Sequence, residues 1–131
     1  MKKSSAFSLL EMLLTLTIIS ILCAIAYPSY SLYFLRQKRF TAEVTLLKLA
    51  AALENFYNEH NSYQQATLDN IGFQTTMGDS YQFAIELATD TQYKISAEPI
   101  HSQQDTQCGK LSLDSNGEKN NSGAGNIQDC W

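Results

Sequence analysis

The chain has 131 residues, enough for one ordinary domain, and its formal net charge of −4 is unevenly distributed. From Phe40 onward four lysines stand against twelve acids, a balance of −8, and these lysines form no run. Such a segment has no general attraction for phosphates, so we do not expect nucleic acid as a partner.

The first predicted element is an apolar helix. Residues 7–27 hold 21 residues with a single charge, Glu11. At a helical rise of about 1.5 Å per residue they cover roughly 31 Å, the thickness of the hydrocarbon core of a bilayer. Lys2 and Lys3 precede the segment and favour a cytoplasmic N-terminus, with the rest of the chain on the other side of the membrane.

Two other targeting signals fit this segment less well. The letters AIA at residues 24–26 match the cleavage pattern of a removable signal peptide, but the apolar part of such a peptide is usually shorter and uncharged. A lipoprotein signal would use Cys23, yet the residue before a lipidated cysteine is normally small and Leu22 is not.

The stretch AFSLLEM, residues 6–12, resembles the class III signal of type IV prepilins and related pseudopilins. In that family a short basic leader ends before a phenylalanine, and a glutamate is the fifth mature residue. The resemblance implies cleavage between Ala6 and Phe7, methylation of the new amine of Phe7, and a fifth-position carboxylate at Glu11. The family favours glycine where this chain has Ala6, and Pro28 lies where the family commonly has a helix-softening proline.

The resemblance also implies a domain organisation and a function. Residues 1–6 would be the leader, residues 7–35 the helix that spans the membrane and later packs in the filament core, and residues 36–131 a periplasmic and then extracellular pilin head. The protein would be a structural subunit, a minor pilin, of a type IV pilus used for adhesion, twitching motility or DNA uptake. Glu11 would pair with the amine of Phe7 of a neighbouring subunit during assembly.

The implied partners are other pilin subunits, the prepilin peptidase that also methylates, the inner-membrane assembly machinery and inner-membrane lipid. Two alternatives remain open. One is a pseudopilin of a type II secretion system, and the other is a DNA-binding competence pilin.

Helical periodicity continues beyond the apolar segment. We predict one helix from about Phe7 to Asn58, with a kink or a short melted stretch near Pro28. Two apolar rows with spacings of three and four residues run along its second half: Leu46, Leu49, Leu53 and Phe56 in one row, and Phe40, Val44, Leu47 and Ala51 in the other.

A polar, turn-rich loop over residues 58–80 precedes three segments of alternating apolar residues, 81–87, 93–97 and 110–113. These predict three or four antiparallel strands with one apolar face, which the long helix is large enough to cover. The expected fold class is α+β. The same pilin-like architecture, a long helix on a small antiparallel sheet, is what the family resemblance implies.

Cys108 and Cys130 are free to form a disulfide in an oxidising compartment, and the family has a C-terminal disulfide that borders a variable surface loop. The letters DSNGE at residues 114–118 predict a hairpin turn more strongly than a calcium loop. His60 and His101 have no metal-ligand or nucleophile–base spacing, and His60 suits a helix end. No catalytic motif appears, so we expect neither an enzyme nor a cofactor.

Overall fold

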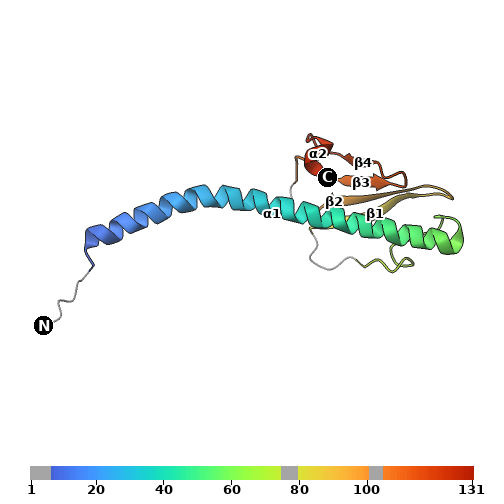
Figure 1. Cartoon of the computed structure of the whole chain (residues 1–131), viewed down its shortest axis with the longest axis horizontal. Helices are drawn as coiled ribbons and strands as arrows, with labels where there is room; N and C mark the ends of the chain where they lie inside the picture. The colour runs from blue at the N-terminus through green and yellow to red at the C-terminus, as the bar shows by residue number, and fades with distance from the viewer. Residues whose placement is uncertain (1–6, 75–79, 101–104) are drawn as a thin grey trace. The chain divides into compact units, whose positions relative to one another are not determined.

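The computed structural model describes residues 7–74, 80–100 and 105–131 (Figure 1). Its contacts divide the chain into two compact units, Met1–Phe34 and Leu35–Trp131. The element order is α1, β1, β2, β3, β4 and α2, where α2 is a single turn at Ile127–Cys130. The predicted α+β class is confirmed.

Helix α1 runs from Leu9 to His60, two residues beyond the predicted end. It is continuous through Pro28, so the melted stretch offered as one alternative there does not form. Proline already has a helical φ and removes only one backbone donor, which a long helix tolerates. The helix ends where Asn61, with φ of 56°, donates its backbone N–H to the carbonyl of Tyr57 at 2.7 Å.

The sheet is an antiparallel meander in the order β1-β2-β3-β4. Its strands are β1 (Tyr81–Ala88), β2 (Tyr93–Pro99), β3 (Leu111–Asp114) and β4 (Lys119–Asn121). Strand β4 forms within a stretch expected to be loop, because a tight turn at Gly117, with φ of 79°, returns the chain along β3. One oxygen of Asp114 accepts the backbone N–H groups of Asn116 and Glu118, both at 2.9 Å, which fixes this turn.

The core of the second unit lies between the sheet and one apolar row of α1. Leu46, Leu49 and Leu53 are fully buried in it. The other row is not part of this core, since Phe40 and Leu47 remain 61% and 51% exposed. The alternating residues of the strands supply the facing side of the core: Tyr81, Phe83, Tyr93, Ile95, Ala97, Leu111 and Leu113.

Arg39 and Asp105 form an ion pair inside this core, and their side chains are only 6% and 1% exposed. The guanidinium donates through Nε to Oδ2 at 2.7 Å and through Nη2 to Oδ1 at 2.9 Å. The hydroxyl of Tyr81 donates to the same carboxylate at 3.3 Å. Burial lowers the pKa of Arg39, but the hydrogen bonds and charge of Asp105 outweigh it and raise the pKa above its ordinary value.

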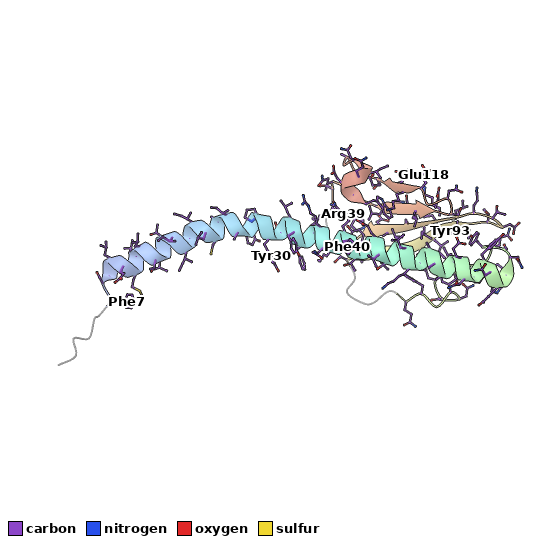
Figure 2. The ribbon with its side chains drawn as sticks, in the orientation of Figure 1. Phe7, Tyr30, Arg39, Phe40, Tyr93 and Glu118 are labelled. Atoms are coloured by element: carbon purple, nitrogen blue, oxygen red, sulfur yellow. A yellow bond between two sulfur atoms is a disulfide. The ribbon has the colours of Figure 1, made fainter. Side chains whose placement is uncertain are left out.

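The same ion pair hydrogen-bonds to the backbone on both sides of the disulfide. Cys108 and Cys130 are bonded in the structure, with a Cα–Cα distance of 5.5 Å. Asp105 accepts the backbone N–H of Cys108 at 3.1 Å, and Arg39 Nη1 donates to the carbonyl of Asp129, next to Cys130, at 3.2 Å. Figure 2 shows Arg39 at the part of α1 beside which the C-terminal segment lies.

Substituting Arg39→Met should therefore destabilise the second unit by about 3–5 kcal/mol, because it leaves the Asp105 carboxylate buried without a counter-ion. Denaturant unfolding of the full chain in detergent micelles measures this loss. Arg36→Met, at an exposed position on the same helix, should change stability by no more than about 0.5 kcal/mol. Equal losses in the two variants would contradict this role for the pair.

An aromatic cluster closes the other end of the core. The Tyr63 hydroxyl lies 3.0 Å from both carboxylate oxygens of Glu54, and its ring stacks on Tyr57 and meets Tyr93 edge-on. Tyr63 and Tyr93, like Tyr81, are buried core residues rather than contact residues at the surface. Burial, reinforced by Glu54, raises the pKa of Tyr63 and of Tyr93 to about 12.

Because the folded protein holds these phenol protons more tightly than the unfolded chain, their contribution to stability is present below pH 10 and is lost as the pH rises toward 12. Tyr63→Phe removes a hydrogen bond worth about 1 kcal/mol at pH 7, but its Tm should fall less than that of the wild type between pH 10 and 12. Thermal unfolding across this range measures both effects. Parallel Tm curves would show that Tyr63 does not titrate with folding.

Candidate assembly interface

The predicted processing site lies at the start of the described chain. Ala6 is outside the described residues, while Phe7 precedes α1 and is 77% exposed. Glu11 lies in the first turn of α1, where its backbone N–H donates to the carbonyl of Ser8 at 3.1 Å. A carboxylate in the first turn is favoured by the partial positive charge of the helix N-terminus.

The first unit presents an apolar surface around α1. An 18-residue window of this helix has a mean hydropathy of 2.4 and none of it is buried, so by length and composition the helix can cross a membrane. The hydroxyls of Thr15, Thr17 and Ser20 donate to helix carbonyls three or four residues earlier, which satisfies them without water. Large aliphatic side chains are exposed along the whole of this unit: Leu9, Leu10, Met12, Leu13, Leu14, Leu16, Ile18, Ile19, Ile21, Leu22, Ile25 and Leu32.

Glu11 is the one charged residue in positions 7–34, and its carboxylate makes no hydrogen bond or ion pair with the other described residues. An ionised carboxylate surrounded by hydrocarbon is costly unless a cation pairs with it. The surface of this unit therefore consists of a long apolar stretch with one anionic group near its end. Such a surface suits packing against other apolar helices that bring a cation to that position.

Apolar exposure also continues along α1 into the second unit. Phe40 and Leu47 are largely exposed, Ala51 is exposed and Val44 is half-buried (Phe40 is labelled in Figure 2). An exposed apolar row on a monomer commonly marks a contact surface. These four residues are the second apolar row that the sequence predicts, and in the structure this row lies outside the core.

The lysines of the second unit are dispersed and partly neutralised. Glu86 accepts from Lys110 at 2.6 Å and lies 3.9 Å from Lys94. The hydrogen bond from Lys110 holds the pKa of Glu86 below its ordinary value. Lys119 lies over the ring of Trp131, with its ammonium 5.1 Å from the ring centroid. These contacts leave no concentrated positive patch on the described strands.

The residues considered as metal ligands in the sequence have structural roles instead. Within the described residues no group of three or more His, Cys, Asp or Glu side chains is placed to hold a metal. Asp114 fixes the β3–β4 turn, as the hairpin prediction requires, and His60 ends α1 with Nδ1 2.9 Å from the carbonyl of Phe56. His101 lies outside the described residues.

The buried ion pair of Arg39 and Asp105 is the feature that the sequence analysis does not predict. A signal was present, because Arg39 and Ala42 extend the buried row of Leu46 and Leu49 with the same spacing of three and four residues. Asp105 gives no comparable signal in the sequence.

Comparisons with known protein families match residues 1–112 of the chain in two parts. The family model described as "Type IV minor pilin ComP, DNA uptake sequence receptor" matches residues 28–112, and the "Prokaryotic N-terminal methylation motif" matches residues 1–27. The major pilin PilA of Myxococcus xanthus is 30% identical over 86 residues, which are 66% of this chain and 39% of that protein. The chain thus matches well under half the length of that relative.

Two solved structures share the fold. The non-core minor pilin PilV of Neisseria meningitidis superposes with a TM-score of 0.58 at 15% identity, covering 70% of this chain and 89% of that one. A type IV pilin of Shewanella oneidensis superposes with a TM-score of 0.55 at 28% identity, covering 74% of this chain and 97% of that one. In both the helix-on-sheet arrangement matches the expected fold.

Proposed function

Because this chain belongs to the type IV minor pilin family, we propose that it is a structural subunit of a type IV pilus and not an enzyme. The observation that supports this most is the exposed apolar surface of α1 with one carboxylate near its start, that of Glu11, which has no hydrogen-bond or ion-pair partner among the described residues. A helix with such a surface can pack against lipid or against copies of itself.

Processing precedes assembly in this proposal. A prepilin peptidase cuts between Ala6 and Phe7 on the cytoplasmic side and methylates the new amine of Phe7. The match of residues 1–27 to the methylation motif supports this step. Residues 7–35 then anchor the subunit in the inner membrane by a single pass, with residues 36–131 in the periplasm until the inner-membrane assembly machinery moves the subunit into an extracellular filament.

Assembly exchanges contacts with lipid for contacts between helices. The apolar side chains of the first unit are equally satisfied by lipid and by neighbouring helices, so they give little direction to the exchange. Glu11 does favour assembly. An ionised carboxylate in hydrocarbon raises the free energy of the subunit by a few kcal/mol, and pairing with a cation in the filament removes that penalty. The amine of Phe7 of a neighbouring subunit is the cation, and the pair sets the depth at which a new subunit docks.

Glu11→Ala should leave membrane insertion and the fold of the second unit intact while reducing incorporation into filaments. If the pair contributes about 1.4 kcal/mol, incorporation falls about tenfold. The measurement is the amount of the chain in sheared filaments relative to the amount in the membrane fraction. Glu59→Ala is the matched control, since it removes an exposed glutamate from the other end of the same helix. Normal incorporation of Glu11→Ala would remove the pairing mechanism.

A second candidate function is DNA uptake, favoured by the description of the matching family as a DNA uptake sequence receptor. The balance of −8 from Phe40 onward and the pairing of Lys94 and Lys110 with Glu86 predict no sequence-independent affinity for DNA. Receptor function therefore requires contacts with base edges at a specific site.

A gel-shift assay with the full chain in detergent tests this candidate against a library of short duplexes at several salt concentrations. We expect no shift of random duplexes at physiological salt. A shift restricted to one duplex sequence, weakening as salt rises, would support the receptor function. If no duplex shifts, the receptor function is rejected and only the structural role remains.

A further inference from the structure

A groove of about 530 Å³ lies where α1 ends, within the second unit. It is lined by the last turn of the helix, the loop that follows, and the tip of the β1–β2 hairpin: Phe56, His60, Ser62, Gln64, Gln65, Asn70 and Asp90. Ser62 donates to Asp90 at 2.9 Å, and the backbone N–H of Tyr63 donates to the carbonyl of Thr89 at 3.1 Å. These bonds join the loop to the hairpin, so the groove is preformed.

Gln65 has an unfavourable backbone conformation at the edge of this groove. Its φ is 67° in the turn that the backbone N–H of Ala66 closes onto the carbonyl of Tyr63 at 3.0 Å. Glycine or asparagine usually occupies such a turn position, because other residues meet steric resistance there. The side chain of Asn70 holds the turn by donating to the Gln65 carbonyl at 2.7 Å. Residues in such a sparsely populated backbone region cluster at ligand-binding sites, and Gln65 lines this groove.

The groove is lined by the ring of His60 and by polar side chains that make few hydrogen bonds within the protein. The ring of His60 stacks on Phe56 with centroids 4.0 Å apart, and His60 is exposed. Within the described residues, neither the side-chain amides of Gln64 and Gln65 nor the second carboxylate oxygen of Asp90 makes a hydrogen bond. The lining includes one acid and no lysine or arginine, which disfavours phosphate, sulfate and carboxylate ligands.

We propose that this groove binds a neutral saccharide. The apolar face of a pyranose ring packs on the exposed ring of His60, as sugar C–H groups do on aromatic faces. Asp90 accepts hydrogen bonds from sugar hydroxyls, and the amides of Gln64 and Gln65 each supply a donor and an acceptor. A groove of this volume accommodates one or two sugar rings. This site adds ligand recognition to the proposed structural role and does not depend on processing or filament assembly.

The test uses the full chain in detergent micelles on an array of neutral and anionic oligosaccharides, followed by titration of the best neutral ligand. We expect binding to at least one neutral saccharide and none to sulfated or sialylated ones. Asp90→Asn keeps the shape of the groove but loses charged acceptors, so it should weaken binding about tenfold. The matched control is Asp69→Asn, an exposed acid of the same loop that does not line the groove, and it should bind normally.

A second variant separates ligand recognition from folding. Gln65→Gly relieves the backbone strain and removes the side-chain amide, so it should raise the Tm while weakening saccharide binding. The proposal is overturned if no neutral saccharide on the array binds, or if the titrated saccharide binds Asp90→Asn and Gln65→Gly as tightly as the wild type. Either result would leave the incorporation of the chain into filaments unaffected, so the two proposals fail separately.

Discussion

The second unit depends on the ion pair between Arg39 and Asp105. A guanidinium and a carboxylate are almost completely removed from water there, an arrangement that is favourable only if every remaining donor and acceptor is used. Asp105 accepts the backbone N–H of Cys108, and Arg39 donates to the backbone carbonyl of Asp129, the residue before Cys130. The pair therefore sets where the C-terminal segment meets α1, and the disulfide makes that position covalent.

This arrangement explains how a polar C-terminal segment stays attached to a small core. Residues 119–126 are rich in asparagine, serine and glycine and contribute little apolar area. The hydrogen bonds of Gly123 and Gly125 to the backbone of Cys108 and Gln107 hold the segment close, and a side chain at Gly123 would collide with that backbone. The segment can therefore vary in its exposed side chains while its attachment to the core stays the same.

Much of the fold could be predicted because it follows from local patterns. The apolar run, the rows of leucines in α1 and the alternation in β1 to β3 all reflect burial of one face of an element. A fourth strand was allowed for, but its position was not predicted, because Lys119–Asn121 is polar on both faces and forms a strand only by pairing with β3. The Arg39–Asp105 pair was missed because it joins residues 66 positions apart, and hydrophobic periodicity carries no information about such pairs. The saccharide groove depends on a φ value and on three separate segments, which no single stretch of sequence reveals.

Assembly through Glu11 requires that the apolar helix remain part of the mature protein, with Phe7 as its first residue. The mass of the N-terminal peptide of the chain, isolated from sheared filaments, tests this most directly. We expect a peptide that begins with methylated Phe7 and has Glu11 as its fifth residue. A mature chain that begins at Tyr27, after removal of the apolar segment, would contradict it.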